Sequence, residues 1–230
     1  MSAGSSTVAG RRPRVFPHDA RAPGLSLRDA GLVFLRQRTA HVAGGLLLAS
    51  GIGRMIVGGW SVWDLVVLAS FVALHPFAEW VIHVGLLHWR SRRWRGFTVD
   101  FELAREHRAH HQRPHDPRTW YIPLRSGLVG YGLLGGLMAL VAPTVGLWLT
   151  GVAMMSTMCL LYEWTHHLCH SSYRPRGAIY RRLWRQHRLH HFKNEHYWMG
   201  VTMHLGDRVL GTRPKPGSVP TSPTCRDLLG

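Results

Sequence analysis

The stretch DLVVLASFVALHPFAEWVIHVGLLH, residues 64–88, joins an apolar run to two histidines at its end. About 20 apolar residues are enough to cross the hydrocarbon core of a bilayer, so residues 64–87 predict a membrane-spanning helix. Glu79 precedes His83 by one helical turn, which places a carboxylate and an imidazole on the same face. His83 and His88 are five residues apart and diverge on an ideal helix, so we expect the helix to end or distort between them.

Three further apolar segments accompany this one, at residues 41–60, 126–142 and 144–162. A short turn containing GGWSVWD joins the first of them to residues 64–87, and Pro143 separates the last two without any charged residue between them. The sequence therefore predicts an all-α integral membrane protein with about four transmembrane helices. The third segment is short, which leaves open a re-entrant hairpin in place of two complete spans.

Charge is distributed unevenly along the chain, which carries 28 Lys plus Arg against 12 Asp plus Glu. Apart from Arg54, the basic residues fall in three blocks outside the apolar segments, at 11–38, 90–125 and 174–226. An even number of spans puts all three blocks on one side, as the positive-inside rule requires, so both termini and the histidines are expected in the cytoplasm. A nucleic-acid binder would carry its basic residues on a soluble scaffold, and we expect no nucleic-acid partner.

The chain is divided by composition into a basic, partly disordered tail at 1–40, a membrane domain at 41–212 and a C-terminal tail at 213–230. Residues 1–23 lack the apolar core of a signal peptide and are expected to be disordered. Cys159, Cys169 and Cys225 form no paired framework and are expected to be free thiols.

Histidines supply the chemical signal, because ten of the 17 fall in four closely spaced motifs. The pairs are His83 with His88 and His166 with His170, and the two H-x-x-H-H triplets are His107, His110, His111 and His187, His190, His191. Residues three and four apart share a helix face, so each triplet can direct its imidazoles at one metal ion or at two neighbouring ones. The order of hairpin, pair and triplet occurs twice, which indicates one shared di-metal site where the two halves meet.

The ligand type alone does not choose the metal, because imidazole-rich sites accept iron, zinc, copper or nickel. A zinc hydrolase needs fewer ligands and usually a carboxylate base, whereas two irons can share the electrons needed to split dioxygen. We therefore expect two iron ions, with zinc as another possible occupant and dioxygen as cosubstrate.

Carboxylates usually orient metal-bound histidines by accepting the second imidazole N–H. Glu79, Glu163 and Asp207 are the candidates for this role, with a helix-end or capping role as the alternative. Five other histidines receive no metal role: His75, His115, His167, His196 and His204. His167 stands beside His166 and leaves the pairing with His170 ambiguous.

From Glu79 to Thr212 the chain resembles the fatty acid hydroxylase and sterol desaturase superfamily, whose histidine boxes have this order. The spacing is most similar to the fatty acid 2-hydroxylase branch, including HHFKN at 190–194, GVT at 200–202, Asp207 and GT at 211–212. The resemblance implies a membrane stalk, a cytosolic helical cap holding the histidine-rich di-metal site, and reaction with dioxygen and external electrons. Members of the branch often carry a b-type cytochrome domain, for which residues 1–40 are too short. The implied electron donor is therefore a separate ferredoxin or b-type cytochrome with its reductase.

These observations predict an oxygen-dependent oxidoreductase that hydroxylates or desaturates a lipid, with a fatty acyl chain as the preferred substrate. Sterol desaturase or oxidase and carotenoid hydroxylase are alternatives within the superfamily. A histidine-rich metal transporter or store is the alternative from another class, but a transporter places its ligands midway through its spans. Composition favours a bacterial plasma membrane, with the endoplasmic reticulum as the location in a eukaryote.

Overall fold

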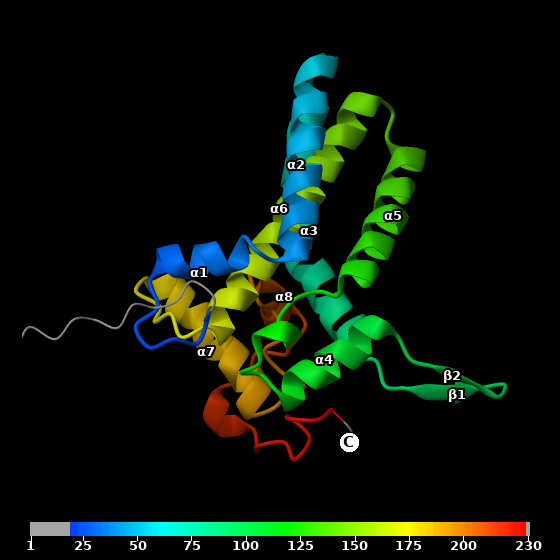
Figure 1. Cartoon of the computed structure of the whole chain (residues 1–230). Coiled ribbons are helices and arrows are strands. Elements are labelled where there is room, and N and C mark those ends of the chain that lie inside the picture. The colour runs from blue at the N-terminus through cyan, green and yellow to red at the C-terminus, as the bar shows by residue number, and fades with distance from the viewer. Residues whose placement is uncertain (1–18, 229–230) are drawn as a thin grey trace, which may run out of the picture.

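Four long helices stand above a cap of shorter helices in the computed structural model, which describes residues 19–228 (Figure 1). They are α2 (Arg38–Val57), α3 (Val62–Ile82), α5 (Leu124–Val141) and α6 (Val145–His170). Together with the turns that extend α3 and α5, these four are long and apolar enough to cross a membrane. Helix α6 is the centre of this stalk and contacts α2, α3 and α5. The predicted fold class is confirmed.

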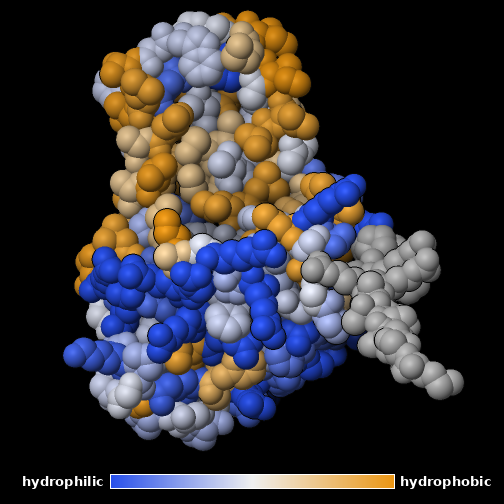
Figure 2. Space-filling model, turned by 90° about the vertical axis from the view of Figure 1, so that its left-hand side faces the viewer, coloured by the Kyte–Doolittle hydropathy of each residue, from blue (hydrophilic) through white to orange (hydrophobic). Residues whose placement is uncertain are grey.

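The outer surface of the stalk is apolar, as a lipid environment requires. Ile56 and Leu140 expose 80% and 85% of their surface, and many other large apolar side chains also point outward. Figure 2 shows this hydrophobic upper part and, below it, a band of hydrophilic residues where the cap begins. In water an exposed apolar surface of this extent would drive association. The stalk is therefore built for the interior of a membrane.

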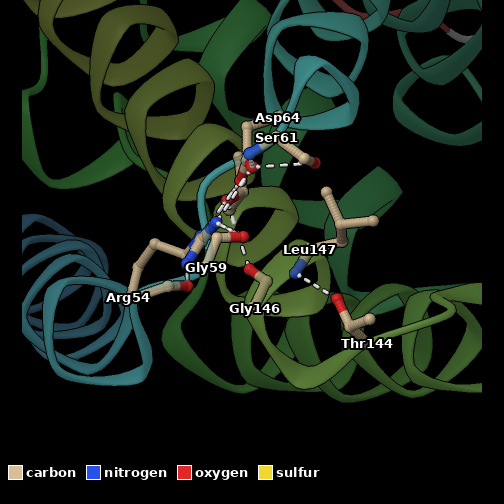
Figure 3. A network of polar contacts seen from close by, with 9 residues as sticks. Arg54, Gly59, Ser61, Asp64, Thr144, Gly146 and Leu147 are labelled. Carbon is tan, nitrogen blue, oxygen red and sulfur yellow. Dashed lines mark hydrogen bonds and ion pairs between the residues drawn. The ribbon is translucent and has the colours of Figure 1, made fainter.

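One charged pair is buried at the end of the stalk far from the cap (Figure 3). The Arg54 guanidinium donates to both carboxylate oxygens of Asp64, at 3.0 and 2.9 Å, and the Thr150 hydroxyl donates to the same carboxylate at 2.7 Å. A Cβ on Gly146 would lie 3.2 Å from the guanidinium, so a glycine there lets α6 approach closely. The network ties the α2–α3 turn, which carries the Ser61 cap of α3, to the start of α6.

Helix α3 ends in a single π-helical turn, η1 (His83–Leu87). The His88 N–H donates to the His83 carbonyl at 3.0 Å, across five residues instead of four. A π turn brings residues five apart onto one face, where an α-helix would separate them. The prediction of a distortion between the two histidines is confirmed.

The cap is made of α4 (Glu102–Gln112), α7 (Ala178–Phe192), α8 (Leu205–Val209) and the 3-10 turns η2 (Pro117–Thr119) and η3 (Pro216–Ser218). A small antiparallel hairpin, β1 (Arg92–Trp94) with β2 (Phe97–Val99), extends from it. Helix α6 runs beyond the predicted end of its apolar segment at residue 162, because nothing in residues 163–170 breaks a helix and the cap buries them. The last two turns of a candidate span therefore belong to the cap.

Both ends of the described chain pack against the cap. Residues 1–18 of the expected disordered stretch lie outside the described residues, but α1 (Leu27–Phe34) packs Phe34 against Trp164, with ring centroids 5.2 Å apart. At the other end, the Ser222 N–H donates to the Lys193 carbonyl at 2.7 Å. The sequence patterns did not predict this packing within 1–40 and 213–230. The three cysteines are free thiols, as expected.

Candidate metal centre

The ten predicted histidines converge where the stalk meets the cap, carried by α3 with η1, by α4, by the end of α6 and by α7. They form two groups, within each of which the available nitrogens lie within 4.8 Å of one another: His110, His166, His170, His187 and His191, and His83, His88, His107 and His190. All are buried except His88, which is partly buried. Each group has the size and composition of a metal site.

His111 is the remaining member of the ten and lies between the two groups. Its ring centroid is 4.1 Å from that of His191 in the first group, and 4.8 and 5.0 Å from those of His107 and His190 in the second. The three histidines of each H-x-x-H-H triplet are therefore shared between two neighbouring positions. The spacing allowed each triplet to face one metal ion or two neighbouring ones, and the structure has the second arrangement.

Lone pairs meet at the centre of the five-histidine group. The His170 Nε2 lies 2.7 Å from the His187 Nε2 and 3.1 Å from the His110 Nε2. The other nitrogen of His170, Nδ1, faces the Pro114 carbonyl at 3.0 Å and is therefore the protonated one, which leaves Nε2 as an acceptor. A cation is the ligand that such converging acceptors accommodate.

Buried nitrogens without partners mark both groups. The Nε2 atoms of His83, His88, His107, His111, His166 and His190 are buried and have no hydrogen-bond partner. Buried polar groups in proteins are normally paired, because an unpaired one loses its hydration without compensation. Metal coordination would satisfy all six, so the residues fit a pair of metal ions.

Backbone carbonyls orient these imidazoles. Nδ1 atoms face carbonyl oxygens at His83 with Met199 (2.6 Å), His111 with Cys225 (2.9 Å), His166 with Trp120 (2.7 Å), His170 with Pro114 (3.0 Å) and His190 with Tyr197 (2.9 Å). A carbonyl only accepts, so each Nδ1 carries the proton and each Nε2 keeps its lone pair for a metal. The tautomer is thus set by loops that close around the helices.

Glu79 and Asp207 contact the backbone of a loop, where the sequence suggested that they contact the imidazoles themselves. Asp207 accepts from the N–H groups of Met199 and Gly200 at 2.9 and 2.8 Å, and Glu79 accepts from those of Val201 and Thr202, both at 2.9 Å. The expected imidazole contacts are replaced by these backbone contacts, because the 199–202 loop runs between the carboxylates and the histidines. The carboxylates hold the loop whose Met199 carbonyl orients His83.

Glu163 also contacts backbone in place of an imidazole. Its Oε1 accepts from the Ile122 N–H at 2.8 Å, while its Oε2 is buried without a partner. The Ile122 segment carries the Trp120 carbonyl that orients His166, so this carboxylate too positions a loop whose carbonyl accepts from an imidazole.

Burial keeps the cap imidazoles neutral. Loss of hydration, together with repulsion between neighbouring imidazoles, holds the pKa values of His88, His107, His110, His187, His190 and His191 well below the ordinary range. Burial lowers the pKa of His111 to about 3. Neutral imidazole is the form that binds a metal, so the ligands are ready at neutral pH.

The histidines without a predicted metal role belong to neither group. The His75 ring contacts the Thr202 hydroxyl at 2.9 Å, and the His167 Nδ1 lies 2.7 Å from the Tyr121 hydroxyl. His167 also packs against Phe34, so His166 is the one of the adjacent pair that faces the centre. Sequence reasoning missed the orienting carbonyls, which no side-chain pattern reveals.

Comparisons with known proteins agree with this geometry. The family profile described as Fatty acid hydroxylase matches residues 68–212. Two Arabidopsis thaliana proteins named dihydroceramide fatty acyl 2-hydroxylase are similar to the chain. The first, FAH1, is 26% identical over 71% of this chain and 67% of its own length. The second, FAH2, is 26% identical over 64% of this chain and 60% of its own length.

A solved structure described as full length scs7p, with only its hydroxylase domain visible, has the same fold. The TM-score is 0.63 at 20% sequence identity, and the likeness covers 84% of this chain and 68% of that one. The family profile covers more than half of the chain and includes all ten clustered histidines. The chain belongs to the fatty acid hydroxylase family.

Proposed function

We propose that this chain is a membrane-bound di-iron oxygenase that hydroxylates, or desaturates, a C–H bond of a lipid with dioxygen and external electrons. Membership of a hydroxylase family makes it an oxidoreductase of lipids. The observation that carries the finer proposal is the pair of adjacent, buried, all-histidine groups at the end of the stalk.

Iron suits these groups better than the other metals that imidazole accepts. Zinc has no redox chemistry and could not pass electrons to dioxygen. When bound, two iron ions would supply the activation of dioxygen and the electron transfer that attack on an unactivated C–H bond requires. The ten histidines would hold both ions, with His111 between them.

The chain's own residues position the lipid and keep water away. Helices α3 and α6 belong both to the stalk and to the histidine groups, so a lipid in the bilayer reaches the centre along them. The cap buries the imidazoles, and the carbonyl contacts hold each ring in one orientation. The position of the bound lipid thus decides which of its carbons is oxidised, because the metals do not themselves select a carbon.

A fatty acyl chain is the substrate that we propose, joined to its lipid by an amide. The two Arabidopsis thaliana relatives are named for a dihydroceramide fatty acyl chain and for its carbon 2. Sterols and carotenoids are the alternative substrate classes. The lipid mass spectrometry described below distinguishes them from an acyl lipid.

We further propose that the cap and both termini face the cytoplasm of a bacterial plasma membrane, or of the endoplasmic reticulum in a eukaryote. The described basic residues other than Arg54 support this orientation, because they lie outside the apolar segments and on the cap side. A separate ferredoxin, or a b-type cytochrome with its reductase, would deliver electrons to the cap. Residues 41–212 would form the hydroxylase domain, flanked by 1–40 and 213–230.

Lipid mass spectrometry of cells that express the wild type, His110→Ala or His190→Ala tests the proposal, since each variant removes a ligand from a different group. We expect a lipid that gains oxygen or loses two hydrogens in the wild type, and a loss of at least about 100-fold in either variant. His115→Ala is the matched control, because His115 belongs to neither group.

An unchanged lipid profile, with iron, oxygen and reductant supplied, would overturn the oxygenase. Metal uptake or storage would then be the better account of the histidines. That alternative is less well supported, because the ligands lie at one end of the stalk and not midway through it.

A further inference from the structure

Three arginines lie around His204, the residue that immediately precedes α8. Arg182 comes from α7, Arg208 from α8 and Arg213 from the segment that follows α8. Burial, together with the charges of these three arginines, lowers the pKa of His204 to about 4. Burial and the charges of Arg208 and Arg182 also lower the pKa of Arg213. The four basic side chains are therefore neighbours, and we call them the His204 cluster.

The His204 cluster has an excess of positive charge and of unused hydrogen-bonding nitrogens. Within residues 19–228, none of its three guanidinium groups forms an ion pair. Asp207 lies near Arg213, but its oxygens already accept from two backbone N–H groups and a hydroxyl. Both ring nitrogens of His204 and the Arg213 Nε are buried and have no hydrogen-bond partner. Since buried donors are normally paired, the cluster lacks an acceptor.

The charge of the cluster decides which class of ligand it can take. Three guanidinium groups repel a cation, so the imidazole of His204 does not mark another metal site. A guanidinium presents its N–H groups in a planar fork that matches the oxygens of a phosphate or a carboxylate. A phosphate offers enough oxygens to accept from several such donors at once, so it fits a cluster of three arginines.

The cluster lies at the level of the membrane boundary. Helix α8 packs directly on α3, because a Cβ on Gly206 would clash with the Pro76 carbonyl and lie 3.4 Å from the Trp80 Cβ. Both α3 residues belong to the candidate span 62–87, and Figure 1 shows α8 where the stalk meets the cap. Large apolar side chains on and next to α8 are exposed beside the cluster: Leu205, Val209 and Leu210. At this level phospholipids present their phosphates to basic side chains and their acyl chains to apolar ones.

We infer that the His204 cluster binds the phosphate group of a membrane phospholipid. The guanidinium groups of Arg182, Arg208 and Arg213 donate to the phosphate oxygens, and the His204 imidazole donates its N–H. The acyl chains lie along the exposed apolar side chains of α8. His204 belongs to neither histidine group, so this site is separate from the metal centre and does not depend on the proposed oxygenase.

Binding measured by native mass spectrometry tests the site. The full chain, purified in detergent and freed of bound lipid, is titrated with dioleoyl phosphatidic acid. Dioleoylglycerol has the same acyl chains without the phosphate, and inorganic phosphate supplies the anion without the chains. We expect the wild type to bind the phosphatidic acid at least about tenfold more tightly than either of the other two.

Arg208→Gln combined with Arg213→Gln should bind the phosphatidic acid at least about tenfold more weakly than the wild type, because two of the charged donors are lost. Arg181→Gln combined with Arg185→Gln is the matched control. It removes the same charge from α7, and the Arg181 guanidinium already donates to the Arg176 carbonyl at 2.6 Å. The control should bind like the wild type.

Equal weakening in the two double variants would show attraction by overall positive charge and would overturn the site. Dioleoylglycerol that binds as tightly as phosphatidic acid would overturn recognition of the phosphate, and inorganic phosphate that binds as tightly would overturn the lipid as its source. Size-exclusion profiles and metal content identify a variant that has failed to fold. Arg208→Gln alone, at an exposed position, then replaces the double variant, and wild-type affinity in it would overturn the site.

Discussion

Five imidazoles of the centre are oriented by a backbone carbonyl that faces their Nδ1, those of His83, His111, His166, His170 and His190. At His83 the carbonyl belongs to Met199, 2.6 Å away, and the Met199 N–H in turn donates to Asp207. Asp207 also accepts from Gly200 and from the Thr212 hydroxyl, at 2.8 and 2.6 Å. One carboxylate therefore fixes a loop and, through it, a ligand direction.

Asp207→Asn should weaken metal binding at the four-histidine group selectively. An amide offers one acceptor oxygen where the carboxylate offers two, so either Met199 or Gly200 loses its partner and the carbonyl facing His83 moves. Changes of this kind lower metal affinity by about 10- to 100-fold. Metal analysis after dialysis should show metal lost from one of two positions, while Asp29→Asn on α1 keeps both. Full occupancy in Asp207→Asn would show that the loop does not need this carboxylate.

Acid should destabilise the metal-free protein. Burial lowers the pKa of His111 to about 3 from an ordinary value of 6.5, so between these values the unfolded chain binds a proton that the folded chain excludes. The folded state keeps its full stability above about pH 6.5 and loses it as the pH falls toward the lowered value. Thermal midpoints of chelator-treated protein from pH 8 to pH 4 should therefore decrease below about pH 6.5. A midpoint that stays constant or rises would contradict neutral, buried imidazoles.

At the scale of elements, two features of the helices build the site. The π turn η1 turns His83 and His88 toward one centre, with ring centroids 4.9 Å apart. Helix α6 continues from the stalk into the cap and carries His166 and His170 there. At its other end α6 is held by the buried Arg54–Asp64 pair, so this long helix is fixed at both ends.

Removing one partner of that pair should cost more than removing both. Asp64→Leu leaves the Arg54 guanidinium buried without a counterion and should lower the thermal midpoint clearly. Arg54→Met combined with Asp64→Leu leaves no buried charge and should recover much of this loss. Thermal unfolding in detergent measures both, with Thr150→Val as a variant that loses only hydrogen bonds and about 1 kcal/mol. A double variant as unstable as Asp64→Leu would show that the pair stabilises through more than charge compensation.

For the whole molecule, the centre is closed by a segment from the C-terminal end of the described chain. Figure 1 shows the C-terminal segment wrapping the side of the cap that faces away from the stalk. Within it, the Cys225 carbonyl faces His111 at 2.9 Å, and Ser222 and Thr224 donate to the buried Glu195 carboxylate at 2.9 and 2.5 Å. This segment belongs to the folded cap and orients the histidine that lies between the two groups.

Truncation after Thr212 should therefore lower both thermal stability and metal content. His111 loses its orienting carbonyl, and Glu195 loses two hydroxyl donors in a buried position. Cys225→Ser is the control, because it keeps the backbone carbonyl and should keep the metal. The difference in thermal midpoint with and without added iron should shrink in the truncated chain, since a ligand that binds more weakly stabilises the folded state less. An equal difference in both chains would show that the segment does not contribute to the centre.

The sequence by itself determined the features that depend on local spacing. Apolar runs of membrane-spanning length gave four helices, because the period and length of such runs are set by helix rise and bilayer thickness. The five-residue step from His83 to His88 predicted a distorted helix, and the H-x-x-H-H triplets predicted shared faces on α4 and α7. These relations involve neighbours along the chain, so they can be read without the fold.

The tertiary structure alone decided how the ten histidines divide into groups of five and four with His111 between them. It also decided that carbonyls of Met199, Trp120 and Cys225 orient the rings, where the sequence suggested carboxylates. The physical reason is that every residue carries the same backbone carbonyl, so its sequence gives no sign of which one will meet an imidazole. That choice depends on long-range packing of loops against helices, which local spacing does not encode.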